Sequence, residues 1–366
     1  MPSSPNSNLT LKSSDNGVIT KGKNYRVATP LQRDNLDMKN ELRLDPLTGR
    51  WVVVAYERSA RPSSFLDRDT NIQKGSIIEC PFCPGHEEDT PPALETYSEQ
   101  GHWLLRVVPN KYPAFVGNEP MVAITKGPVF TTAPASGIHE VIVLSPDHNL
   151  GWSDLPNDQV KLVMRGIRDR INAHSDSHVV RYSQAIVNSG REAGASLEHP
   201  HGQLLATSFV PREITDELAG FSRFLGGCVL CATMEAEAAV DDRIVLEDSE
   251  TVTISPFWAS QPYELLIIPK NHQEHIHKAS ENELDSIALS VKTTLGSLRE
   301  HLGDIAYNLV FHSSPYREHG RFHWHVHIVP KLTTRAGFEL GTGVMINIVP
   351  PEKAASELKA ILSRTD

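Results

Sequence analysis

The sequence predicts an α+β protein made of two tandem copies of one module, each an antiparallel sheet flanked by helices. The first observation behind this prediction is a pair of cysteines with two residues between them, which occurs once in each half: Cys80 with Cys83, and Cys228 with Cys231. The second is an apolar run that begins with glutamate and ends with histidine, "EVIVLSPDH" at 140–148 and "ELLIIPKNH" at 264–272. The third is a histidine pair that closes each copy, "HPH" at 199–201 and "HWH" at 323–325.

Equal spacings between these landmarks indicate a duplication. His148 and His199 are 51 residues apart, and so are His272 and His323. In the short strand predicted before each histidine pair, Asn188 lies 11 residues before His199 and His312 lies 11 residues before His323. We therefore expect a mobile tail at 1–40, a first domain at 41–213 and a second domain at 214–366.

Each copy is expected to contain, in order, two strands, a helix and two further strands. The helices are predicted at 153–174 and 280–302. Ser153 and Ser280 are the expected N-caps, because a serine hydroxyl can accept a hydrogen bond from the first turn of a helix. The strands that follow the helices are predicted in "AIVNSG" and "LVFHSS".

Composition limits the classes of partner. The net charge of -10 argues against binding to a nucleic-acid polymer, which needs many lysine and arginine contacts to phosphate. No run of 18 apolar residues and no signal-peptide pattern occurs, so we expect no membrane association and a cytoplasmic location. The tail is rich in Ser, Asn and Gly, which predicts mobility, with an organelle transit peptide as the alternative.

The cysteines predict metal sites, because a turn with two cysteines offers two thiolates to a tetrahedral zinc ion. Two closed structural sites, one in each copy, are expected: Cys80, Cys83, His148 and His199 in the first, and Cys228, Cys231, His272 and His323 in the second. The alternative is that the cysteines are small buried apolar residues.

The histidine pairs predict a reactive site, because residues two apart in a strand point to the same face. If His199 binds a metal, His201 is free to act as a nucleophile towards phosphorus through Nε2, provided that a carbonyl group binds its Nδ1–H. The Gln203 amide can donate a hydrogen bond to a phosphoryl oxygen. The glycine-rich approach "NSGREAGAS" at 188–196 favours this interpretation over two structural histidines.

A phosphate ligand also needs cations. Arg58 and Arg61 follow the apolar strand "WVVVAY" and stand just before a proline, as residues at the rim of a site would. A solvated surface is the alternative interpretation of these two arginines.

Several segments together resemble the galactose-1-phosphate uridylyltransferase family, a duplicated branch of the histidine-triad superfamily. They are "ELRLDPLTGRWVVVAYERSARP", "CPFCPG", "VVPNKYPAF", "HEVIVLSPDHN", "SLEHPHGQLLATSFVPRE" and "AGFELGTGVMIN". The resemblance covers nearly everything after the tail, and "HPHGQ" is its most specific part. It implies a half-barrel sheet with flanking helices, a homodimer, zinc, and a role in galactose and carbohydrate metabolism.

The resemblance implies ping-pong chemistry, in which His201 attacks the α-phosphorus of a sugar nucleotide such as UDP-glucose and a hexose 1-phosphate leaves. Gln203 resembles the residue that binds the phosphoryl group. The positions that the resemblance assigns to substrate are Arg58, Arg61, Asn110, Asn188, Ser196 and Glu339, and His325 and His327 are further candidates.

Two features keep alternatives open. The second copy, "HWHVHIVP", holds a complete triad with His325 in the middle, so a nucleotide hydrolase that uses this triad is one alternative. The second cysteine pair is similar to that of ADP-glucose phosphorylase, which transfers an adenylyl group to phosphate, whereas some uridylyltransferases use a glutamate that matches Glu217. A zinc-stabilised binding protein without enzymatic activity is the third alternative.

Overall fold

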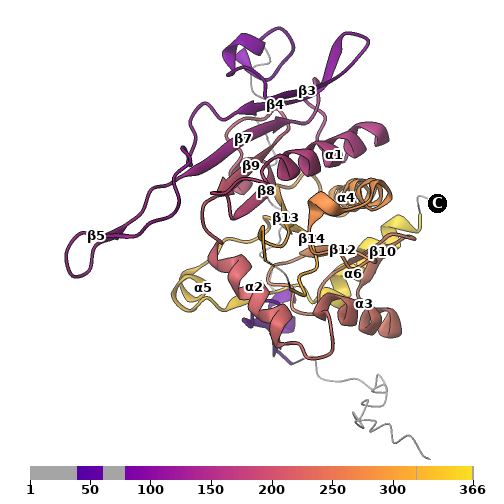
Figure 1. Ribbon diagram of the computed structural model, residues 1–366. Helices are drawn as coiled ribbons and strands as arrows, with labels where there is room; N and C mark the ends of the chain where they lie inside the picture. Colours follow the sequence, from indigo (N-terminus) through magenta and orange to yellow (C-terminus); the bar gives the residue numbers. More distant parts are fainter. Residues whose placement is uncertain (1–38, 61–78, 319, 365–366) are drawn as a thin grey trace, which may run out of the picture. The chain divides into compact units, whose positions relative to one another are not determined.

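Strands from both halves of the sequence form one antiparallel ten-stranded sheet in the computed structural model, which describes residues 39–60, 79–318 and 320–364 (Figure 1). Across the sheet the strands are β10 (Ile244–Glu247), β11 (Thr251–Ile254), β12 (Leu265–Pro269), β14 (His325–Pro330), β13 (Tyr307–His312), β8 (Tyr182–Ser189), β9 (His201–Thr207), β7 (Gly137–Val143), β4 (His102–Pro109) and β3 (Glu95–Glu99). The predicted α+β class with an antiparallel sheet is confirmed. Most of the predicted tail lies outside the described residues.

The two halves of this sheet are arranged symmetrically about the pair β8 and β13. Ile186 in β8 pairs with Val310 in β13, and these residues are 124 positions apart in the sequence. His148 and His272 are separated by the same 124 positions. A residue and its counterpart in the other copy therefore face each other at the centre of the sheet. On this basis we propose a tandem duplication with a boundary near 213.

Two long helices cover one face of the sheet (Figure 1). They are α1 (Asn157–Ala173) and α4 (Glu281–Leu302), which also contact each other. Their apolar sides pack on alternate residues of the strands in one buried core, in which Val163, Ile287 and Leu204 have no or almost no exposed surface. Because the strand residues alternate between faces, the opposite face is left for His201 and the other candidates.

The helix caps partly follow the sequence prediction. Ser280 caps α4 in a capping box, in which its hydroxyl accepts from the Glu283 backbone and the Glu283 carboxylate accepts from the Ser280 backbone. The prediction for Ser153 is wrong, because α1 begins at Asn157 after Pro156. Proline fixes the extended entry into this helix, and the Ser153 hydroxyl binds the neighbouring Asp154 carboxylate instead.

On the opposite face of the second half, α2 (Arg212–Arg223) and α3 (Val229–Val240) pack in a second buried core with β10, β11 and β12. A separate three-stranded sheet consists of β1 (Glu41–Leu44), β2 (Trp51–Val54) and β15 (Met345–Asn347), and Asn347 donates to the Ala259 backbone oxygen before β12 at 2.9 Å. The short α5 (Gly337–Thr342) precedes β15, and α6 (Pro351–Leu362) ends the chain. Gly220 allows α2 to approach the loop before β2, because a Cβ atom there would lie 1.9 Å from the Leu47 carbonyl oxygen.

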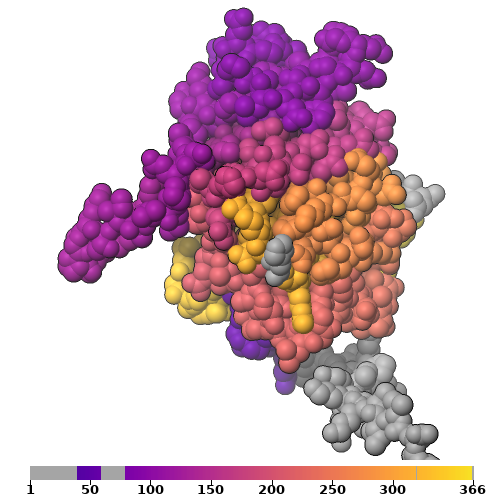
Figure 2. All heavy atoms as spheres, viewed as in Figure 1, coloured from indigo at the N-terminus to yellow at the C-terminus, as the bar shows by residue number. Residues whose placement is uncertain are grey.

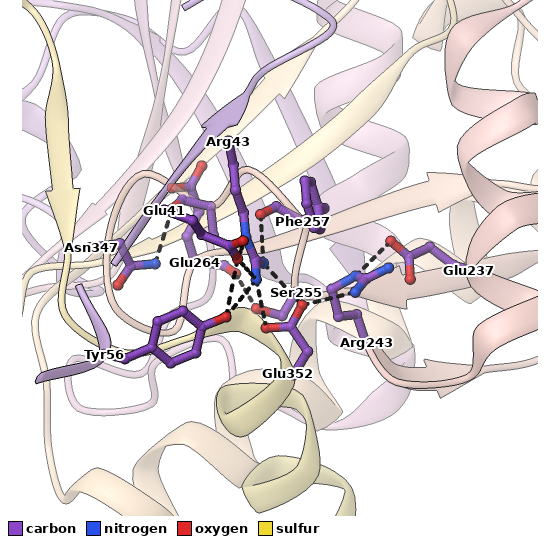
Figure 3. A network of polar contacts seen from close by, with 11 residues as sticks. Glu41, Arg43, Tyr56, Glu237, Arg243, Ser255, Phe257, Glu264, Asn347 and Glu352 are labelled. Atoms are coloured by element: carbon purple, nitrogen blue, oxygen red, sulfur yellow. Dashed lines mark hydrogen bonds and ion pairs between the residues drawn. The ribbon is translucent and has the colours of Figure 1, made fainter. Parts of the chain in front are cut away.

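A network of buried ion pairs and hydrogen bonds links β1, near the start of the described chain, to α6 at its end (Figure 3). The Arg43 side chain in β1 is 4% exposed and donates to the Glu352 carboxylate of α6 at 2.9 Å. Arg243 donates to the same carboxylate at 2.8 Å and to Glu237 of α3 at 2.9 Å. Burial alone would raise the pKa of Glu352, but hydrogen bonding and charge from Arg43 outweigh it and lower that pKa. The network therefore holds β1, α3 and α6 together.

A long connection between β4 and β7 projects from the body of the molecule and ends in a hairpin of β5 (Ile124–Thr125) and β6 (Thr131–Thr132) (Figure 2). Its apolar residues Met121, Val129 and Phe130 are exposed. Within the described ranges, no helix combines the length and the apolar composition that crossing a membrane requires.

Candidate active site

The structure brings the first predicted metal set together on the open face beside β9. One donor atom each from Cys80, Cys83, His148 and His199 lies within 4.8 Å of all the others, and all four residues are buried. The thiol of Cys83 lies 3.3 Å from Nδ1 of His148 and 3.6 Å from Nδ1 of His199. Residues from the loop that holds both cysteines, from the loop after β7 and from the segment just before β9 thus meet at one point.

The second predicted set has the same geometry. Nδ1 of His323 lies 3.5 Å from the Cys228 sulfur and 3.6 Å from the Cys231 sulfur. Nδ1 of His272 lies 3.7 Å from the Cys231 sulfur. This cluster is less shielded than the first, since both cysteines are partly exposed.

These separations fit a tetrahedral zinc ion. With Zn–S near 2.3 Å and Zn–N near 2.05 Å, the edge of the tetrahedron is about 3.6 Å. The Nε2 atom of His199 lies 2.9 Å from the Ser145 carbonyl oxygen and donates to it, which leaves Nδ1 free to bind a metal. Burial lowers the pKa values of His199 and His323 to about 4, so both rings are neutral, as metal ligands must be. The residues in both clusters are therefore compatible with zinc.

His201 begins β9 directly after the first cluster. The sequence pattern predicted His199 in the same strand, but this is wrong, because β9 starts at His201 and His199 precedes it. His201 Nδ1 lies 2.8 Å from the His199 carbonyl oxygen and donates to it. Phe82, which lies between the two cysteines of the cluster, packs on the His201 ring at 5.3 Å. Burial lowers the pKa of His201, so its Nε2 carries a lone pair at neutral pH.

A third cluster lies on the same face in the second half. One donor atom each from Glu217, His312, His325 and His327 lies within 4.8 Å of all the others. His312 Nδ1 is 2.8 Å from the Glu217 carboxylate. Burial alone would raise the pKa of Glu217, but the charge and hydrogen bond of His312 outweigh it and lower the pKa of Glu217 to about 2. Carboxylate and imidazole ligands of this kind also suit a metal ion.

The two middle histidines differ in access. His325 has the same backbone contact as His201, since its Nδ1 donates to the His323 carbonyl oxygen at 2.8 Å. The His325 side chain has no exposed surface, and its buried Nε2 lies 3.8 Å from the Glu217 carboxylate without a hydrogen bond. Nε2 of His201 is not among the buried, unpartnered side-chain atoms of the described residues. Both rings are thus buried, but His201 keeps 5% of its surface exposed and His325 keeps none, and only His325 faces a carboxylate.

The glycine-rich segment 188–196 is hydrogen-bonded to the sheet by Asn308, a residue that the sequence did not single out. Asn308 in β13 donates from Nδ2 to the Asn188 side-chain oxygen and to the Ala193 backbone oxygen, both at 2.8 Å. Gly190 and Gly194 flank this turn with φ values of 85° and 88°, which glycine adopts without strain. The Asn308 contact crosses between the two copies, so only the assembled sheet reveals it.

The other predicted substrate residues are spread over several elements. Asn110 lies at the end of β4, half-buried, with Nδ2 3.1 Å from the His139 ring. Ser196 is exposed in the approach to His199, and Arg58 is exposed in a short 3-10 helix (Tyr56–Ala60) after β2. Glu339 lies in α5, where its carboxylate accepts from the Ala336 backbone at 3.0 Å. Arg61 lies outside the described residues, and among those described no hydrogen bond or ion pair joins Glu339 to the residues around His201.

His139 and His312 are two further residues of the site that the sequence did not predict. His139 contacts both Asn110 and Gln203, and His312 completes the third cluster. The position of His312, 11 residues before His323, had marked the repeat without indicating a ligand. Its partner Glu217 is 95 positions away, so no local spacing connects them.

Comparison with known proteins decides the family. Models of the N-terminal and the C-terminal domain of galactose-1-phosphate uridyl transferase match residues 30–211 and 215–361. The chain belongs to the galactose-1-phosphate uridylyltransferase family. The sequence prediction of a nucleotidyltransferase of this family is confirmed.

Among members of the family, an ADP-glucose phosphorylase from Arabidopsis thaliana is 32% identical over 330 residues, 88% of this chain and 93% of that protein. A galactose-1-phosphate uridylyltransferase from Thermotoga maritima is 31% identical over 332 residues, 87% of this chain and 98% of that protein. The crystal structure of the Arabidopsis ADP-glucose phosphorylase with bound ADP-glucose matches with a TM-score of 0.75 at 31% identity, and covers 87% of this chain and 98% of that chain. The chain therefore shares its fold and nearly its whole length with both kinds of enzyme.

Proposed function

We propose that this chain transfers a nucleoside monophosphate from a sugar nucleotide to a second phosphorylated acceptor through a covalent bond to His201. One observation carries the proposal. The Nδ1–H of His201 is held by the His199 carbonyl oxygen at 2.8 Å, so the ring is in the tautomer whose Nε2 has the lone pair. Gln203 lies two residues further along β9 and therefore on the same face.

The proposed reaction has two displacements. First, the His201 Nε2 lone pair forms a bond to the α-phosphorus, and the bond from this phosphorus to the sugar-phosphate oxygen breaks, so that a hexose 1-phosphate leaves. Second, a phosphate oxygen of the acceptor attacks the same phosphorus, and the phosphorus–nitrogen bond breaks. The Gln203 amide would donate a hydrogen bond to the phosphoryl oxygen, on which negative charge accumulates in each step.

The proposed substrates are UDP-glucose and a hexose 1-phosphate such as galactose 1-phosphate. The "HPHGQ" segment and the uridylyltransferases among the relatives support this choice. ADP-glucose with phosphate as acceptor is the second candidate, and it is favoured by the cluster at Cys228 and Cys231 and by the similarity to the Arabidopsis phosphorylase. Both candidates use the same nucleophile and differ in base and acceptor.

Hydrolysis by the second triad is a weaker alternative. The Nε2 atom of His325 is buried beside the Glu217 carboxylate, and a phosphate that approached it would meet negative charge and would have to displace buried contacts.

We further propose two structural zinc ions for each chain. Cys80, Cys83, His148 and His199 would hold the first, and Cys228, Cys231, His272 and His323 would hold the second. A bound zinc ion would supply rigidity, since all four ligand positions are taken by protein. By fixing Phe82 and His199, the first site would orient the His201 ring that both of them contact.

The test is to trap the covalent intermediate. The protein is incubated with UDP-glucose and, separately, with ADP-glucose without acceptor, and intact mass and peptide mapping locate the adduct. We expect a nucleotidyl group on His201 that is lost on adding galactose 1-phosphate or phosphate, whichever is the acceptor. His201→Ala should retain its zinc but form no adduct. Labelling of His325 would contradict the assignment of the nucleophile, and absence of any adduct would favour a binding protein without enzymatic activity.

A further inference from the structure

A histidine on the neighbouring strand contacts Gln203, the residue that the proposed function assigns to the phosphoryl group. His139 lies in β7 and Gln203 in β9, and these strands pair antiparallel, with Gln203 opposite Val141. His139 is two residues from Val141, so the side chains of His139 and Gln203 are diagonal neighbours on one face. The His139 Nε2 atom and the Gln203 side-chain oxygen lie 2.8 Å apart.

A backbone contact fixes the tautomer of this histidine. The Ala114 backbone N–H donates to Nδ1 of His139 at 3.1 Å, so Nδ1 must carry a lone pair. In a neutral imidazole the proton is then on Nε2. A proton on Nδ1 would place two donors against each other. His139 therefore donates through Nε2, and the Gln203 oxygen accepts.

This contact selects one of two orientations of the Gln203 amide. A glutamine side chain can present either its oxygen or its NH₂ group in a given direction, because the two ends are nearly equal in size. With its oxygen bound to His139, the NH₂ group of Gln203 is left for another partner, and none of the described residues accepts from it. His201 precedes Gln203 by two residues, so the two side chains lie on the same face of β9.

The neighbouring Asn110 contacts the same ring nitrogen of His139. Its Nδ2 lies 3.1 Å from Nε2 of His139, and its side-chain oxygen accepts from the Tyr112 backbone at 2.9 Å. The Asn110 NH₂ group faces the same Nε2 atom and would donate to it only if the proton were on Nδ1. The Ala114 backbone donor and the Gln203 oxygen both require the proton on Nε2, and these two contacts decide the tautomer.

We propose that His139 is a positioning residue, which holds the Gln203 amide with its NH₂ group towards the phosphoryl group that His201 attacks. The proposal rests on the proposed function of His201 and Gln203. Donors fixed before the reaction stabilise developing charge without reorganising during it, so loss of the His139 contact should slow the chemical step more than it weakens substrate binding.

The first test is a double-mutant cycle in single-turnover kinetics of adduct formation. His139→Phe should slow the maximal rate about 10-fold, with less than a 2-fold change in the substrate concentration at half-saturation. In a Gln203→Ala background the same change should have less than a 2-fold effect, because the amide it positions is gone. His139→Gln, which keeps an N–H donor, should restore part of the rate. The proposal would be overturned if His139→Phe slowed adduct formation equally in the wild-type and Gln203→Ala backgrounds. It would also be overturned if His139→Phe changed only the substrate concentration at half-saturation and not the maximal rate.

The second test does not depend on catalysis. Ring ¹⁵N chemical shifts of the full-length, zinc-loaded protein, with the His139 signal assigned by its loss in His139→Phe, should show an unprotonated Nδ1 and a protonated Nε2. A proton on Nδ1 would refute the orientation of Gln203. A wild-type protein that forms no adduct would contradict the proposed function, while this measurement would still decide the role of His139.

Discussion

Glu140 offers the most direct test of how the site-bearing strand is held in place. It follows His139 in β7 but points to the opposite face, towards α1, and is 1% exposed. Its carboxylate accepts two hydrogen bonds from Arg170, at 2.9 Å and 2.7 Å, and lies 3.0 Å from Nε2 of His174. Glu140→Gln removes the negative charge and leaves the Arg170 guanidinium, whose side chain is 13% exposed, without its buried partner.

Breaking a buried pair from one side costs about 3–5 kcal/mol. The glutamine keeps one acceptor, so we expect about 3 kcal/mol, which corresponds to a fall in the melting temperature of roughly 6 °C in a domain of this size. Urea and thermal unfolding of the zinc-loaded protein at pH 7 would measure both quantities. Glu95→Gln is the matched control, because Glu95 contacts the same arginine at 3.4 Å but is 36% exposed and should contribute less than about 1 kcal/mol.

The pH dependence has a definite sign. Burial alone would raise the pKa of Glu140, but the hydrogen bonds and charges of His174 and Arg170 outweigh it, so its pKa lies below the ordinary value of 4.5. The stabilisation is therefore fully present above about pH 4.5 and is lost as the pH falls through the lowered pKa. The difference between the wild type and Glu140→Gln should shrink below pH 4.5. If the two glutamate variants proved equally stable at pH 7, the reasoning would be refuted.

Two further predictions concern close packing and metal content. Gly220→Ala should leave little folded protein, because its Cβ would lie 1.9 Å from the Leu47 carbonyl oxygen, whereas Gly296→Ala in α4 meets nothing within 4 Å and should stabilise by about 1 kcal/mol. Soluble yield and thermal unfolding compare the two, and similar stability of both variants would contradict the close approach of α2. Cys231→Ser should lower the zinc content by about one ion per chain, measured by elemental analysis after dialysis, while the Cys80 cluster keeps its ion. An unchanged zinc content would contradict the second site.

Local spacing was sufficient for much of the candidate site. A turn with two cysteines brings both thiols together whatever surrounds it, and strand alternation puts His201 and Gln203 on one face. The equal 51-residue spacings located the four histidines of the two cysteine–histidine clusters, two in each cluster. The first residue of α4 could also be predicted from the sequence, because a capping box requires only Ser280 and Glu283, three positions apart.

The sequence by itself thus determined the family, the α+β class and the cysteine–histidine clusters, because each depends on residues whose spacing along the chain sets their geometry. Only the tertiary structure distinguished the surroundings of the two similar histidine segments. His201 and His325 share their local backbone contact, and they differ because Glu217, from α2, lies against the second. The partner of Gln203 was hidden for the same reason, since His139 is 64 positions away and reaches it only when β7 pairs with β9.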